Sequence, residues 1–124
     1  MITGTVNASN EAIVQLRIRG AVPDPLSIHA LIDTGFTDWL TLSPAQIVAL
    51  GLAFREEGAY VLADGSMARA RLFSGEVEWL TGWRRILVLE MDGGPLIGMA
   101  LLRGSYLGAE IIDGGKVEVR SLTP

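Results

Sequence analysis

The chain has 124 residues, of which 49% are hydrophobic and 19% are charged, so it can bury the core of one domain. Its net charge is −4 and its ten basic residues are scattered, which excludes nucleic acid as the expected partner; its short apolar runs exclude a membrane span. With no cysteine and no signal-peptide pattern, we expect a single domain over residues 1–124, located in the cytoplasm.

Two strands are predicted near the start of the chain. "IVQLRIR" at 13–19 alternates apolar and polar residues, so Val14, Leu16 and Ile18 are expected on one buried face. "LSIHALI" at 26–32 is nearly apolar on both faces, which is typical of a strand in the centre of a sheet.

A short strand at 39–42 is expected to lead into the clearest helix of the chain. Ser43 can cap this helix, Pro44 suits its first position and Gln46 completes a capping box. Gly51 provides the stop. About two turns are too few for the crossover helix of a parallel sheet, so the helix is expected to pack on a β domain.

The second half of the chain also favours short strands separated by glycine. Residues 59–73 predict a hairpin with its turn at Asp64-Gly65, a strong turn dipeptide. The other predicted elements are strands at 75–80 and 84–91, a short helical stretch within 96–104, and a hairpin over 109–119. The expected fold class is therefore all-β with one or two short helices.

One aspartate differs from the others that precede a glycine. Three sites are plain Asp-Gly turns, where aspartate bonds to the local backbone and glycine supplies positive φ. In "ALIDTGFTD", however, Thr34 separates Asp33 from Gly35. A hydroxyl then lies beside the carboxylate, and glycine allows a close approach to it. The four competing sites are at 32–35, 63–66, 91–94 and 112–115.

A single carboxylate is not enough for acid–base hydrolysis of an amide. One group must take a proton from water while another delivers a proton to the substrate. Two carboxyls that share a proton can do both, and a C2 dimer would supply the second copy of Asp33. The alternative is an intramolecular pair of Asp33 with Asp113, although Asp113 has the sequence of an ordinary hairpin turn.

Three motifs in order resemble those of retropepsin-like aspartic proteases, the single-domain form known from retroviruses and prokaryotes. They are "ALIDTGFTD" at 30–38, "LADGS" at 62–66 and "LIGMALL" at 96–102. The resemblance implies a closed β-barrel of the acid-protease type that acts as a homodimer on a peptide or protein. One Asp-Thr-Gly from each subunit would meet at the two-fold axis, with no metal ion or cofactor.

The same resemblance assigns roles to residues of this chain. Asp33 would be the catalytic acid and base, Thr34 would join the two loops across the dimer, and Gly35 would leave space for substrate. The flap tip would contain Ala63, Asp64 and Gly65, and the segment packed under the active-site loop would contain Leu96, Ile97 and Gly98.

The chain departs from the viral pattern at two positions. Phe36 follows the Asp-Thr-Gly where the viral enzymes usually have a small residue, as in a prokaryotic branch of the clan. Met99 stands where the viral helix usually begins with arginine, so Asp38 loses its obvious ionic partner. Arg103 is the candidate replacement.

The leading hypothesis is an aspartic endopeptidase whose water is activated by two Asp33 carboxylates, one from each subunit. The alternative is a dimeric β-barrel module that binds an extended peptide or protein without cleaving it. A third class, another carboxylate-based hydrolase such as a glycosidase, needs two carboxyls that lie too far apart to share a proton.

Overall fold

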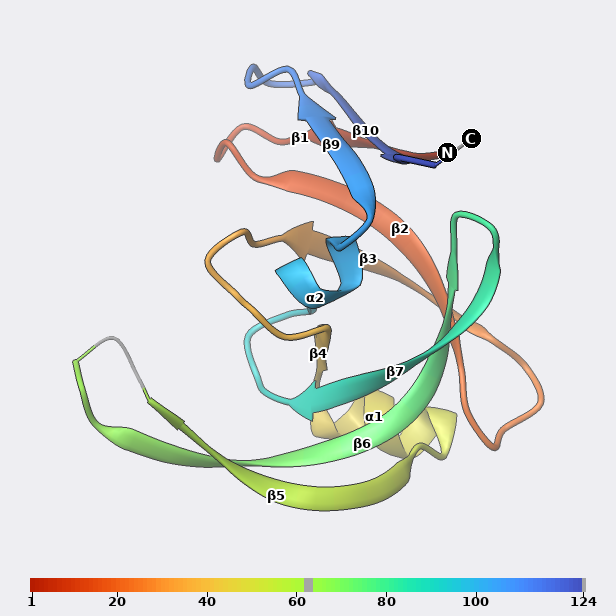
Figure 1. Cartoon of the computed structure of the whole chain (residues 1–124), viewed down its shortest axis with the longest axis vertical. Helices are drawn as coiled ribbons and strands as arrows, with labels where there is room; N and C mark the ends of the chain where they lie inside the picture. The colour runs from red at the N-terminus through yellow and green to blue at the C-terminus, as the bar shows by residue number, and fades with distance from the viewer. Residues whose placement is uncertain (62–63, 124) are drawn as a thin grey trace.

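The computed structural model of the chain describes residues 1–61 and 64–123, and within them it contains ten strands and two short helices (Figure 1). The elements are β1 (Ile2–Val6), β2 (Ala12–Arg19), β3 (Leu26–Ile32), β4 (Leu40–Leu42), α1 (Pro44–Leu50), β5 (Ala53–Val61), β6 (Met67–Trp79), β7 (Gly82–Glu90), β8 (Leu96–Ile97), α2 (Met99–Leu102), β9 (Ser105–Ala109) and β10 (Lys116–Ser121).

Six of these strands form a closed β-barrel. Their order is β6-β7-β4-β8-β3-β2, and pairing between β2 and β6 at Ile18–Val77 and Arg19–Glu76 closes the circle. β1, β10 and β9 extend the sheet outward from β2, while β5 extends it from β6. The expected all-β class, the closed barrel and the two short helices are therefore confirmed.

The barrel is filled by the side chains that the alternating pattern predicted. Val14, Leu16 and Ile18 of β2 are buried, as expected, and they face Ile28 and Ala30 of β3 in one apolar cluster. β3 lies between β2 and β8, which confirms its predicted central place.

Helix α1 follows its local sequence signals closely. The Ser43 side chain accepts a hydrogen bond from the backbone N–H of Gln46, whose side chain accepts one from the backbone N–H of Ser43. Gly51 ends the helix in the left-handed conformation, with φ of 64°. Ile47 and Leu50 bury the inner face of the helix against the barrel.

The predicted break between strands at 59–73 and 75–80 is wrong, because β6 runs without interruption from Met67 to Trp79. Gly75 is a site of close packing rather than a turn, since a Cβ atom there would lie 2.9 Å from the Leu52 side chain. β6 pairs with β5 along most of its length and reaches β2 near its end. This long, curved strand is what closes the barrel.

Two similar segments face each other in the barrel. β3, β4 and α1 follow one another in the first half, and β7, β8 and α2 follow one another in the second. β3 pairs in parallel with β8, and β4 pairs in parallel with β7. The loop that follows β3 is therefore placed beside the segment formed by β8 and α2.

The two helices of the described residues are seven and four residues long, and neither is both long and apolar enough to cross a membrane.

Candidate active site

The connection between β3 and β4 carries Asp33, and we call residues 33–38 the Asp-Thr-Gly loop. The backbone N–H of Asp33 donates to the carbonyl oxygen of Ile97 at 2.9 Å, which continues the pairing of β3 with β8. The N–H of Phe36 then donates back to the carbonyl of Asp33 at 3.1 Å, which makes a tight turn. Asp33 is half-buried, whereas Thr34 and Gly35 are exposed at the tip.

The carboxylate of Asp33 is oriented by its own loop. Its Oδ1 accepts a hydrogen bond from the backbone N–H of Gly35 at 3.0 Å. A Cβ atom on Gly35 would lie 3.3 Å from the same oxygen. Glycine therefore leaves open one side of an oriented carboxylate at the molecular surface.

The Asp-Thr-Gly loop rests on the segment that joins β8 to α2. The N–H of Gly98 donates to the carbonyl of Trp39 at 3.0 Å, and the N–H of Met99 donates to the carbonyl of Phe36 at 2.8 Å. Gly98 is buried, and a Cβ atom there would overlap the carbonyl oxygen of Asp38. Only glycine allows the two backbones to approach this closely.

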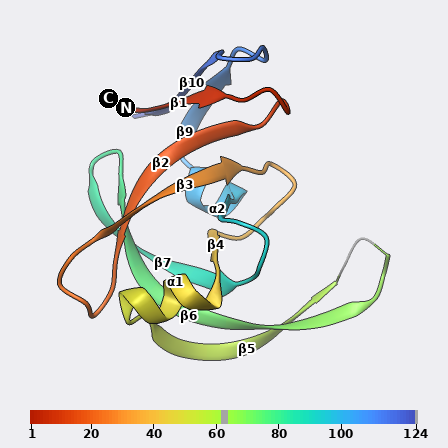
Figure 2. The ribbon, with the colours of Figure 1, turned by 180° about the vertical axis from the view of Figure 1, so that it is seen from behind.

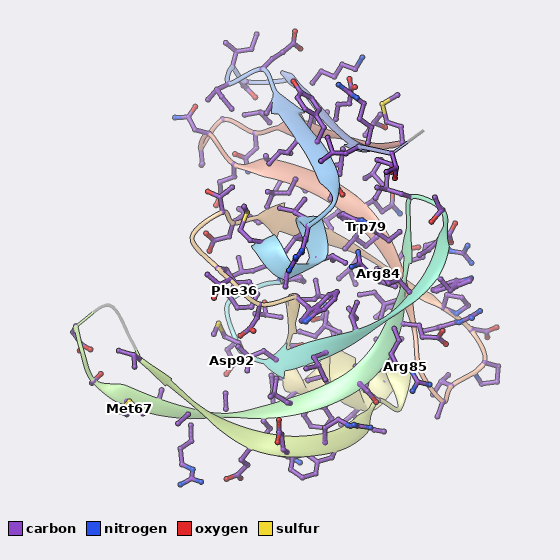
Figure 3. All side chains as sticks on the ribbon, in the orientation of Figure 1. Phe36, Met67, Trp79, Arg84, Arg85 and Asp92 are labelled. Atoms are coloured by element: carbon purple, nitrogen blue, oxygen red, sulfur yellow. The ribbon has the colours of Figure 1, made fainter. Side chains whose placement is uncertain are left out.

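Phe36 has a structural explanation that the sequence did not provide. Its Cδ2 would lie 2.6 Å from a Cβ atom on Gly98, so the ring occupies the space that a side chain at 98 would need. Figure 3 shows Phe36 beside α2, and its side chain is half-buried. Phe36 therefore packs the Asp-Thr-Gly loop against the start of that helix.

Ile97 and Gly98 thus contact the loop, whereas Leu96 pairs with Leu31 of β3 before the loop begins. Ile97 is fully buried, and the N–H of Leu31 bonds to the carbonyl of Pro95 one step earlier along the ladder. These contacts position Asp33; its catalytic role stays a prediction.

The ion pair expected between Asp38 and Arg103 does not form among the described residues. Arg103 lies at the far end of α2, whereas Asp38 lies beside its beginning. A different arginine braces this region: Nη1 of Arg84 donates to the carbonyl of Leu101 at 3.3 Å, and its guanidinium lies 5.0 Å from the ring centre of Trp39. Arg84 therefore links β7, α2 and the end of the loop.

Thr41 is a second supporting residue that the sequence did not reveal. It is fully buried in β4, where its Oγ1 accepts a hydrogen bond from the N–H of Leu96 at 2.8 Å. The same hydroxyl lies 3.4 Å from the carbonyl oxygen of Gly94 and can donate to it. In the sequence, the signal that could have identified Thr41 is a hydroxyl residue placed between two leucines of a short apolar strand.

The predicted flap residues lie at the turn of the β5–β6 hairpin. Asp64 Oδ1 accepts hydrogen bonds from Ser66, at 2.6 Å from the side-chain hydroxyl and 2.9 Å from the N–H, and these bonds lower the pKa of Asp64. Gly65 follows with φ of 84°, and Ala63 lies outside the described residues. Both views of the ribbon place this hairpin's outer part on the same side of the barrel as the Asp-Thr-Gly loop (Figures 1 and 2).

The alternative pair of Asp33 with Asp113 is not brought together. Asp113 is exposed in the turn between β9 and β10, and β10 lies three positions from β3 in the sheet order. Adjacent strands lie about 4.8 Å apart, which gives a separation of roughly 14 Å across the sheet. Two carboxyls at that distance do not share a proton.

Across residues 1–61 and 64–123, no three acidic or histidine side chains gather into a site that could hold a metal ion. No protein-family model, curated protein or solved structure matches the chain. The argument for a function therefore depends on the motifs and on the geometry of this loop.

Proposed function

We propose that the protein is a retropepsin-like aspartic endopeptidase, in which Asp33 of one subunit and Asp33 of a second copy form the catalytic pair. The observation that carries this proposal is the presentation of Asp33. Its carboxylate accepts a hydrogen bond from the N–H of Gly35, and the two ends of the loop form backbone hydrogen bonds with Ile97 and Ala100. The tip itself, Thr34 and Gly35, is exposed and can meet a partner.

The chemistry follows from two carboxyls placed close together. Like charges at short range do not both ionise, so one Asp33 holds a proton and the other is a carboxylate. The carboxylate takes a proton from a water molecule, whose oxygen attacks the peptide carbonyl carbon, while the protonated partner gives its proton to the carbonyl oxygen, and a tetrahedral diol forms. The first Asp33 then gives its new proton to the peptide nitrogen, the C–N bond breaks, and a diol hydroxyl returns a proton to the second Asp33, so that a carboxylic acid and an amine leave and the pair is restored. Gly35 leaves room for the peptide to approach.

The surface around the loop supports association with a second copy. Met99 is exposed directly beside the loop, and the neighbouring Ile32 and Phe36 are half-buried. Apolar side chains around a polar tip are typical of an interface that is covered in the assembled protein. Because the sequence has one Asp-Thr-Gly, a C2 interface centred on Thr34 is the arrangement that pairs two of them.

The β5–β6 hairpin supports an extended peptide as substrate. β5 is a free edge of the sheet, so its backbone can pair with an added strand. Val61 and Met67, at the outer end of the hairpin, have 71% and 64% of their surfaces exposed. We therefore expect a preference for peptides with apolar side chains around the cleaved bond.

The direct test is cleavage of a mixed peptide library at several pH values by the wild type, Asp33→Asn and Asp92→Asn. Asp92 is exposed in another Asp-Gly turn and is the matched control (Figure 3). We expect wild type and Asp92→Asn to cleave, Asp33→Asn to lose about 10²-fold or more, and a statine-type inhibitor to block cleavage. Equal activity of Asp33→Asn would contradict the proposal.

The second candidate is a dimeric module that binds an extended peptide without cleaving it. The same free edge of β5 and the exposed Val61 and Met67 favour this function. The library experiment separates the two: peptides retained by the protein but recovered uncut under every condition would favour binding alone.

A further inference from the structure

A hollow lies at the end of α2 that is remote from the Asp-Thr-Gly loop, and we call it the α2 cavity. Its volume is about 320 Å³. The turn between β6 and β7 forms one wall, and the residues that follow α2 form another. The side chains that matter for its chemistry are Trp79, Trp83, Arg84, Arg103 and Ser105.

The α2 cavity concentrates positive charge. Arg84 and Arg103 both line it, and in the part of the chain that the structure describes neither forms an ion pair with a carboxylate. No aspartate or glutamate is among the described residues that line this cavity. The arginines on the neighbouring strands differ, because they are paired with glutamates: Arg17 with Glu78, Arg19 with Glu76, and Arg71 with Glu90.

One of the two arginines is held in place before any ligand arrives. Arg84 uses Nη1 to bond to the carbonyl of Leu101 and stacks on the ring of Trp39. A guanidinium has five N–H donors in a rigid plane, so most of them remain for an acceptor. Holding a binding group in one orientation lowers the entropy that binding must otherwise remove.

The wall of the cavity also contains a buried donor that lacks a hydrogen-bond partner among the described residues. Trp79 is 4% exposed, and its buried indole N–H makes no hydrogen bond with any described residue. Leu80, the next residue of the wall, has φ of 42°, which is unfavourable for leucine. The tight turn between β6 and β7 accounts for this φ, whereas a buried donor without a partner is rare in folded proteins and leaves the Trp79 indole N–H free to bond to a ligand.

We propose that the α2 cavity binds a small ligand through a carboxylate or phosphate group, which Arg84 and Arg103 hold together. Two oxygens of a carboxylate or a phosphate match the fork of a guanidinium and form its strongest hydrogen bonds. Ser105 lies in the same wall and provides a hydroxyl donor. This site is separate from Asp33, although the two share α2, which begins against Phe36 and ends at Arg103.

The experiment is a titration of the ¹⁵N-labelled protein at pH 7 with sodium phosphate and, separately, sodium acetate, followed by NMR. Sodium chloride at matched ionic strength is the reference. The chain has three tryptophans, so the indole N–H signals of Trp79 and Trp83 are assigned from Trp79→Phe and Trp83→Phe variants. We expect these two signals to shift in a saturable way with at least one of the two anions.

The anion that saturates the signals, phosphate or acetate, identifies the chemical group of the ligand. Saturation by either anion supports the proposal. Arg103 is exposed, so Arg103→Gln should fold normally and weaken binding by about tenfold, as expected when one charge-assisted contact is lost. Arg55→Gln is the matched control, because Arg55 is also exposed and lines a different hollow. No saturation beyond the chloride reference, or equal affinity in Arg103→Gln, would overturn the proposal.

Discussion

The barrel contains two loops at matching places, each with an aspartate near a glycine, and they differ in what lies against their tips. The Asp-Thr-Gly loop follows β3, and residues 91–95, the Asp-Gly-Gly loop, follow β7 at the matching place in the second half. The first is held by backbone bonds to Ile97, Met99 and Ala100. In the second, Asp92 is exposed, and a Cβ atom on Gly93 would touch nothing.

This difference shows that an aspartate near a glycine does not by itself make a candidate site. Asp33 and Asp64 each accept a hydrogen bond from the N–H two residues later, so the local turn is the same in both. What distinguishes Asp33 is the buried segment beneath it, which comes from more than sixty residues away in the chain. The buried segment under Asp33, rather than the local turn, should therefore determine how substitutions affect this loop.

The largest effect is expected at Gly98. Gly98→Ala would push a methyl group into the carbonyl of Asp38 and the ring of Phe36, which should lower the free energy of unfolding by about 3 kcal/mol. Gly35→Ala, in the same loop, would bring its methyl group close only to Oδ1 of Asp33, at 3.3 Å, and should stay within about 0.5 kcal/mol of wild type. Urea denaturation measures both, and a wild-type stability for Gly98→Ala would show that the loop does not rest on β8 and α2.

Gly35 should instead affect catalysis. In Gly35→Ala the methyl group would lie 3.3 Å from Oδ1 of Asp33, the carboxylate that the proposed mechanism uses. Misplacement of a reacting group by about 1 Å costs roughly 10²-fold in rate, and we expect a loss of that size with an unchanged melting temperature. Peptide cleavage assays on the folded variant test this, and an unaltered rate would remove Gly35 from the site.

Thr41 supports the second loop through its side chain. Thr41→Val would leave the N–H of Leu96 without its acceptor inside the barrel, at a cost of about 2 kcal/mol. Thr37→Val, an exposed position in the Asp-Thr-Gly loop, should change stability by less than about 0.5 kcal/mol. If denaturation gives equal stabilities for the two variants, the Thr41 hydroxyl has no role in joining β4 to β8.

The smallest effect concerns the turn at Asp64. Hydrogen bonds from Ser66 lower the pKa of this carboxyl from 3.8, so they favour the folded turn above the ordinary pKa and are lost as pH falls through the lowered value. The NMR shift of the Ser66 amide should therefore titrate with a midpoint below 3.8, and Asp64→Asn should abolish that transition. A midpoint at or above 3.8 would show that the turn is not built around the ionised carboxylate.

Local signals predicted the parts of the fold that depend on neighbouring residues. Helix α1 could be predicted because its seven residues, its capping box and its glycine stop all lie within ten consecutive positions. The buried face of β2 could be predicted from the alternation of its own residues. The β5–β6 turn at Asp64-Gly65 was predicted for the same reason.

The parts that the sequence did not predict depend on distant contacts. β1 pairs with β10 at the other end of the chain as well as with its neighbour β2, and β6 continues through Gly75 because Leu52 packs there. At the site, Asp33 was found from its own motif. Arg84 and Thr41 were missed, because each acts on an atom 17 or more positions away.

The most direct test of the central claim is to mix wild-type and Asp33→Asn subunits at fixed total concentration, refold them together and measure peptide cleavage. If each site needs Asp33 from two copies, activity follows the square of the wild-type fraction, so an equal mixture keeps about a quarter of the activity. A fall in direct proportion, to about half, would mean that each chain carries a complete site and would contradict the account.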